Sequence, residues 1–140
     1  LDLNDFELPL FSSQTEAKLG QPDNAKAFFN KIGDADAVII SFAEHNGSYT
    51  AGYKNLFDWA SRIDQKVFQN KPMLMWSTSP GPGGAQSVLA SATTSAPYFA
   101  GDVKGQLSVP SFYDNFDMEN GKLSNQELNE QLILLTSQLV

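Results

Sequence analysis

Ala37-Val38-Ile39-Ile40-Ser41-Phe42 is the stretch that decides the fold of this 140-residue chain. The run is short, almost continuously apolar and rich in β-branched side chains. A strand with one solvated face would alternate apolar and polar residues, so this pattern indicates a strand that is covered on both faces. Such strands are typical of parallel sheets with helices on both sides, and the run therefore predicts an α/β fold.

Two more strands fit the same plan. Pro72–Trp76 is a second buried strand, and Gln106–Phe112 is a third strand with Pro110 inside it. Pro110 cannot donate a hydrogen bond to a neighbouring strand, so we expect the third strand at an edge of the sheet. The helical spacing of apolar residues predicts helices between the strands: from Pro22 to a stop at Gly33, from about Tyr49 to Ile63, and from Ala85 to about Phe99, with Pro97 ending the last one early.

The two ends of the chain differ in how clearly they can be interpreted. Leu1–Gly20 is predicted to be the tail of a strand, around Leu8–Phe11, followed by a loop. Ser124-Asn125-Gln126-Glu127 is a capping box that predicts the start of a last helix with one leucine-rich face. The alternation of strands and helices predicts a doubly wound parallel sheet in three layers, α/β/α, as one domain over residues 1–140.

Composition excludes several classes of function. The chain has 9 basic and 16 acidic residues, a net charge of −7, and no cluster of Lys and Arg for a nucleic-acid surface. It contains no cysteine, which excludes disulfides, thiolate metal sites and a cysteine nucleophile and favours a cytoplasmic protein. No apolar run reaches the ~20 residues of a membrane span, so a membrane is not an expected partner. The charge distribution likewise makes nucleic acid an unexpected partner.

Three loops follow the predicted strands, at the edge of an α/β sheet where ligands bind: Ala43–Ser48, Ser77–Gly84 and Tyr113–Asp117. The second is glycine-rich but matches neither common phosphate-binding pattern. Pro80 and Pro82 lack N–H groups, which makes the loop a poor phosphate cradle. Its glycines suit the edge of a flat heterocycle, or simply a connection that needs tight turns, and both interpretations stay open.

Acid–base, metal and nucleophilic chemistry find little support. His45 is the only histidine, and with Glu44 beside it cannot make a metal cluster. No nucleophile elbow surrounds Ser77 or Ser79, which disfavours a hydrolase. An exposed loop position is the ordinary alternative for His45. Asp58 and Arg62, four residues apart, are expected to form a solvated ion pair beside a buried Trp59.

Ala43–Ser48 and Lys54–Arg62 resemble the NADPH-dependent FMN reductase family, whose members reduce flavins, quinones, azo dyes or chromate. The usual family pattern is Pro-Glu-Tyr-Asn-x-Ser, then Leu-Lys-Asn-x-x-Asp-Trp-x-Ser-Arg after a short spacer. Further stretches are similar to the family in the same order: Lys71-Pro72, Ser77–Gly84, Leu107–Pro110, and Phe116-Asp117 through Gly121.

The resemblance implies a flavodoxin-like fold and a reductase that transfers hydride from NADPH or NADH to bound FMN, then electrons to a small-molecule acceptor. No side chain need act as a catalytic acid or base. Such proteins commonly form homodimers or homotetramers, and the helix around Tyr53, Phe57 and Trp59 is the expected contact. The implied FMN-binding residues are Ala43, Glu44, His45, Asn46, Ser77, Thr78, Ser79 and Gly81.

Two departures from the family pattern leave alternatives open. Ala43 and His45 stand where the family has Pro and Tyr. The strand, phosphate loop and helix that open the family domain have no counterpart, so we expect an N-terminally incomplete domain, with an exposed apolar edge on the Val38–Phe42 strand. The alternatives are a flavodoxin-like binding or assembly module without catalysis, a truncated fragment without flavin, and an electron carrier that takes no hydride.

Overall fold

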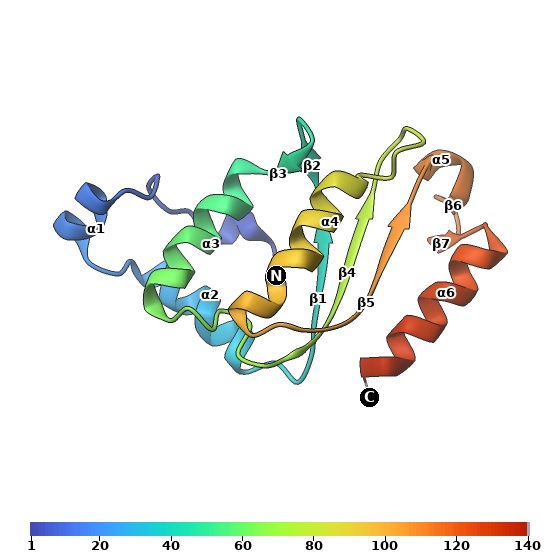
Figure 1. Ribbon diagram of the computed structural model, residues 1–140. Helices are drawn as coiled ribbons and strands as arrows, with labels where there is room; N and C mark the ends of the chain where they lie inside the picture. Colours follow the sequence, from blue (N-terminus) through green and yellow to red (C-terminus); the bar gives the residue numbers. More distant parts are fainter. Residues whose placement is uncertain (140) are drawn as a thin grey trace.

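The computed structural model describes residues 1–139 and has a parallel three-stranded sheet at its centre (Figure 1). The strands are β1 (Val38–Phe42), β4 (Pro72–Thr78) and β5 (Asp102–Val109), in the order β1-β4-β5. Both neighbouring pairs run parallel. Because parallel neighbours need a crossover connection, helices lie between the strands in sequence. The predicted parallel α/β sheet is therefore confirmed.

One face of the sheet carries most of the core. Its helices are α2 (Asp23–Gly33), α3 (Ala51–Ile63) and α4 (Gln86–Ser95). They share one apolar cluster with Met73 and Met75, two β4 side chains that are fully buried. Alternate residues of a strand face opposite sides of the sheet, so these two methionines mark the face that the three helices cover.

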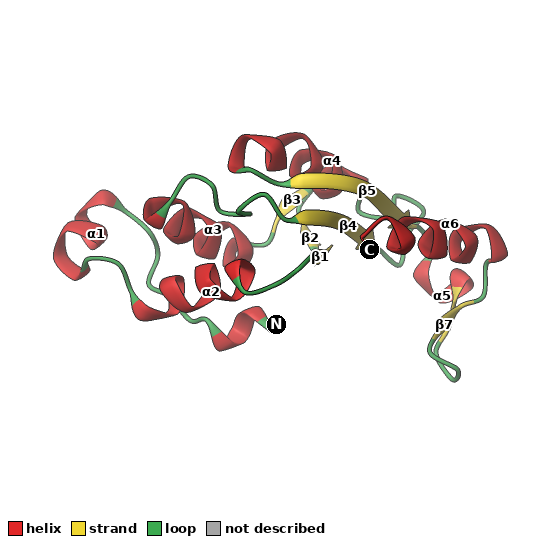
Figure 2. Cartoon of the chain, turned by 90° about the horizontal axis from the view of Figure 1, so that it is seen from below, coloured by secondary structure: helices red, strands yellow, loops and turns green. Residues whose placement is uncertain are grey.

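The other face carries α6 (Gln126–Thr136), which packs against β5, as Figure 2 shows. Leu135 of α6 packs directly on Gly105 of β5, where a β-carbon would overlap the leucine side chain. The glycine therefore lets α6 approach the sheet closely, and the three-layer arrangement is confirmed. None of the helices in residues 1–139 combines the length and apolar character needed to cross a membrane.

The remaining elements are short. They are η1 (Leu3–Asp5), α1 (Ser13–Leu19), β2 (Glu44–His45), β3 (Ser48–Tyr49), η2 (Ala96–Phe99), α5 (Phe112–Asn115), β6 (Phe116–Asp117), β7 (Lys122–Leu123) and η3 (Ser137–Leu139). β2 pairs with β3, and β6 with β7, each as an antiparallel pair.

The N-terminal prediction is wrong. Residues 1–20 hold η1 and α1 in place of a strand, and Pro9 and Phe11 of the apolar cluster contact α3. The indole N–H of Trp59 donates to the Pro9 carbonyl at 2.8 Å, and Phe11 packs edge-on against the same indole. The cluster is thus used for side-chain packing, which leaves its backbone outside the sheet.

Predicted helix ends are confirmed in part. Pro97 falls in η2, directly after α4 ends at Ser95, as expected. Gly33 remains inside α2 without a positive φ, so it is not the predicted left-handed stop. Asn125, one residue later than expected, caps α6 by accepting from the N–H of Leu128 at 3.1 Å. A one-residue shift satisfies the same helical turn, because Asn accepts as well as Ser.

The two edges of the sheet agree with expectation. β5 is an edge strand, although it spans Asp102–Val109 and ends just before Pro110. Among the described residues, β1 pairs only with β4 and forms the opposite edge. Ile39 of β1 is 47% exposed, which confirms an apolar side chain at this open edge.

Candidate functional site

The segments that follow the three parallel strands lie together at the carboxyl end of the sheet (Figure 1). The antiparallel pair Glu44–Tyr49, here called the hairpin, follows β1. The 77–84 loop begins with the last two residues of β4 and continues beyond it, and α5 follows β5. This arrangement is the predicted one, and it brings every predicted cofactor-binding residue to the carboxyl end of the sheet.

The hairpin presents polar, exposed groups at its tip. Asn46 and Gly47 have φ values of +53° and +75°, which is the two-residue turn that favours this pair of residues. His45 is exposed and lies opposite Ser48 in the ladder. Ala43, just before the hairpin, is also exposed. The predicted residues 43, 45 and 46 are therefore accessible to a ligand.

The hydroxyl groups of the 77–84 loop are used to shape the loop. Ser77 is buried, and its Oγ donates to the Gly84 carbonyl at 2.7 Å. Thr78 donates to the Val109 carbonyl at 2.7 Å, and Ser79 donates to the Gly81 carbonyl at 3.0 Å. These three predicted residues therefore hold the loop to itself and to β5 through their side chains.

The glycines of this loop offer what the hydroxyls do not. The backbone N–H groups of Gly81 and Gly83 make no hydrogen bond to any described residue. A β-carbon built at either glycine would meet no atom within 4 Å, so a ligand can approach the backbone closely. Neither the hairpin nor the loop contains Lys or Arg. Two free donors without a nearby basic side chain in these segments suit carbonyl oxygens or ring nitrogens of a ligand that lies against the backbone.

Glu44 joins the hairpin to the helix that follows the loop. Its Oε2 accepts a hydrogen bond from the backbone N–H of Val88, in the first turn of α4, at 2.8 Å. Sequence reasoning missed Val88 because the two residues are 44 positions apart. One signal was present: Ala85 at the helix start has no side chain that could cap it, which indicates an acceptor from elsewhere.

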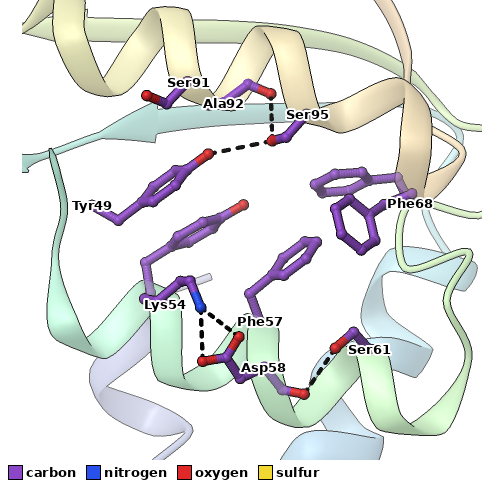
Figure 3. Close-up of a pocket in the computed structure, with 11 residues that line it drawn as sticks. Tyr49, Lys54, Phe57, Asp58, Ser61, Phe68, Ser91, Ala92 and Ser95 are labelled. Carbon is purple, nitrogen blue, oxygen red and sulfur yellow. Dashed lines mark hydrogen bonds and ion pairs between the residues drawn. The ribbon is translucent and has the colours of Figure 1, made fainter.

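A groove of about 320 Å³ runs between α3 and α4 (Figure 3). Tyr49 and Tyr53 stack along it, with ring centres 5.2 Å apart. The Tyr49 hydroxyl lies 3.4 Å from Ser95 Oγ on α4. Burial, with the neighbouring Tyr49 as a second cause, raises the pKa of Tyr53 well above its ordinary value. Phe57 also lines the groove, so two of the three expected contact residues are found here.

Trp59 is buried as expected, whereas the predicted ion pair differs from expectation. The completely buried indole of Trp59 offers no exposed surface for the expected subunit contact. Asp58 pairs with Lys54 at 2.7 Å, whereas Arg62 pairs with Glu16 of α1 at 3.0 Å. The Asp58–Arg62 prediction is therefore wrong. Its physical reason is that α1, which the sequence did not indicate, brings an acidic partner to Arg62.

Residues 1–139 contain no group of three His, Asp or Glu side chains arranged to hold a metal ion.

Part of the chain is similar in sequence to known reductases. It is 35% identical over 81 residues to a quinone reductase of Escherichia coli K12, which covers 57% of this chain and 43% of that protein. It is 39% identical over 80 residues to an NADPH:quinone oxidoreductase of Arabidopsis thaliana, covering 57% and 40% respectively. The aligned part of the chain thus spans less than half the length of these relatives.

A solved structure has the same fold. The chain superimposes on FerB, a flavoenzyme NAD(P)H:(acceptor) oxidoreductase of Paracoccus denitrificans, with a TM-score of 0.77. The match covers 99% of this chain and 78% of that one, at 21% identity. It confirms the predicted flavodoxin-like arrangement of sheet and helices. NADPH-dependent FMN reductase is the family that matches residues 1–114, and the chain belongs to that family.

Proposed function

We propose that this chain is part of an FMN-dependent NAD(P)H oxidoreductase that binds FMN between the hairpin and the 77–84 loop. The N–H groups of Gly81 and Gly83, with open space in front of them, carry this proposal. They lie at the carboxyl end of β4, beside the hairpin, where ligands of open α/β sheets bind. Family membership supports the choice of FMN as the ligand.

The residues of this chain would bind and orient the cofactor. Ala43, His45 and Asn46 would line one side of the ring system, and Ser79 and Gly81 its other side or pyrimidine edge. Glu44, Ser77 and Thr78 would act from behind, because their side chains already bond within the protein. When bound, FMN would supply hydride acceptance from NADPH or NADH and electron delivery to an acceptor.

The acceptor is proposed to be a quinone, a flavin or a similar small molecule. Two relatives are quinone reductases, which supports a planar carbonyl compound. An exposed hairpin tip leaves one side of the proposed site open to such a molecule. Neither the hairpin nor the 77–84 loop contains a Lys or Arg that would favour an anionic acceptor.

A second copy of the chain is the proposed partner, in a homodimer or homotetramer. The aromatic groove between α3 and α4 supports this, because Tyr49, Tyr53 and Phe57 line an apolar hollow beside the hairpin. Sedimentation velocity would test it: a monomer at all concentrations contradicts the proposal, and a larger species that Phe57→Asp dissociates supports it.

FMN titration with fluorescence detection is the first test. We expect saturable quenching, and Gly81→Val should weaken binding because its side chain fills the space in front of the loop. Gly52→Val is the matched control, since a β-carbon there also meets nothing within 4 Å but lies in α3, away from the loop.

The alternatives give different outcomes. Absence of quenching would overturn the proposal and favour a binding or assembly module. Quenching without NADPH oxidation in the presence of a quinone would favour an electron carrier. Binding that Gly81→Val leaves unchanged would place the flavin elsewhere.

A further inference from the structure

The first turn of α4 lacks a cap of its own. Ala85, which precedes the helix, has a left-handed backbone with φ of +56° and no side-chain acceptor. The N–H of Val88 would point into the protein unpaired if no other group approached it, and an unpaired backbone donor at a helix start destabilises it. Val88 is completely buried, which leaves little access for water.

Glu44 supplies the missing acceptor from the hairpin. The bond is charge-assisted, and a carboxylate at a helix N-terminus also interacts favourably with the helix dipole. Glu44 lies directly opposite Tyr49 in the hairpin ladder, so both side chains lie on the same side of it. Tyr49 reaches Ser95 at the other end of α4. The hairpin is thus bonded to the first turn of α4 and also contacts its last residue.

The attachment sets the direction of the neighbouring residue. Successive residues of a strand face opposite sides, so fixing Glu44 toward α4 turns His45 away from it. His45 is indeed exposed. The same helix begins directly after the 77–84 loop, so its first turn is a common reference for the hairpin and the loop.

We propose that Glu44 is a positioning residue, which holds the hairpin at a fixed distance from the 77–84 loop through Val88. This inference rests on the proposed function, since the surface positioned in this way is the proposed FMN site. The Glu44 carboxylate acts through the helix and does not touch the cofactor.

Hydrogen exchange and FMN affinity together test the proposal. Glu44→Ala should raise the exchange rate of the Val88 amide. It should also weaken FMN binding about 10-fold, because the hairpin loses the charge-assisted hydrogen bond that holds it in the binding position. Glu44→Gln should restore most of both, because an amide oxygen accepts the same bond. Glu7→Ala is the control: it removes an exposed carboxylate without a hydrogen bond to any described side chain or backbone group.

Each outcome decides a separate point. Unchanged Val88 exchange in Glu44→Ala overturns the contact. Two results in Glu44→Gln would overturn the positioning role in favour of direct contact with the cofactor. One is restored Val88 protection without restored FMN affinity, and the other is restored protection with a shifted flavin absorption spectrum. Absence of FMN binding by the unaltered protein overturns the proposed function instead, while Val88 exchange still judges the contact.

Discussion

The hairpin and the 77–84 loop both lie at the carboxyl end of the sheet, but they are held there in different ways. The loop is fixed by hydrogen bonds at both ends and in the middle, several of them from the backbone itself. The hairpin is attached through the side chains of Glu44 and Tyr49. Backbone attachment depends on few side chains, whereas side-chain attachment can be altered by single substitutions. The structure therefore combines a rigid surface with an adjustable one.

Gly84→Ala should have the largest effect, because it disturbs the rigid surface. Gly84 has φ of +59°, and a β-carbon there would overlap Ser108 Oγ and approach the Pro110 backbone. We expect a loss of about 3 kcal/mol in the free energy of unfolding, measured in urea. Gly81→Ala, which meets no atom, should change it by less than about 0.5 kcal/mol. Equal effects of the two substitutions would contradict this account of the loop.

Ser77 and Ser108 should behave as a coupled pair. Both hydroxyls donate to the Gly84 carbonyl, at 2.7 and 2.9 Å. Either one alone still satisfies that buried acceptor, so each single Ala substitution should cost about 1 kcal/mol of unfolding free energy. The double variant should lose more than the sum, by about 1 kcal/mol, because the carbonyl is then unpaired. A strictly additive double-mutant cycle would mean that the two hydroxyls act independently.

Alkaline pH should lower stability through the hairpin and not through the 77–84 loop, because the hairpin packs against Tyr53 whereas the loop has no titratable group. Burial raises the pKa of Tyr53 in the folded state. Above pH ~10 the unfolded chain releases this proton and the folded one keeps it, so stability falls as pH rises. We expect a loss of about 1 kcal/mol per pH unit there.

Urea unfolding at pH 8 and 10.5 measures this loss. Tyr53→Phe should remove it, whereas Tyr98→Phe, at a side chain that is 76% exposed, should not. A loss that persists in Tyr53→Phe would assign it to another group.

Tyr49→Phe should have the smallest effect. The hydroxyl lies 3.4 Å from Ser95 Oγ, which is long for a hydrogen bond between hydroxyls, and the ring stacking with Tyr53 would remain. We expect less than about 0.5 kcal/mol in unfolding free energy. A larger loss would show that the hairpin depends on Tyr49 more than on Glu44.

Local sequence patterns were sufficient for the elements that carry strong periodicity. The uninterrupted apolar runs gave β1 and β4 to within a few residues, and Pro97 marked the end of α4. They failed for α1, a seven-residue helix with no buried side chain. Periodicity reports burial, so a short exposed helix leaves no such signal.

The contacts of the site required the folded chain. The glycines of the 77–84 loop suggested close approach by a ligand, but nothing local distinguishes hydroxyls that shape the loop from hydroxyls that face outward. The Glu44–Val88 and Trp59–Pro9 contacts join residues 44 and 50 positions apart. Such pairs depend on how the helices pack against each other, which the local patterns of one sequence do not reveal.

The external cap on α4 also bears on how this protein can be redesigned. Because the acceptor for Val88 comes from Glu44, the start of α4 does not depend on a capping side chain in residues 80–83. Pro80 and Pro82 can therefore be varied in a library without uncapping the helix, while Gly81 and Gly83 keep the space in front of the loop open. Selection among such variants would reach new acceptors while the scaffold beneath them stays the same.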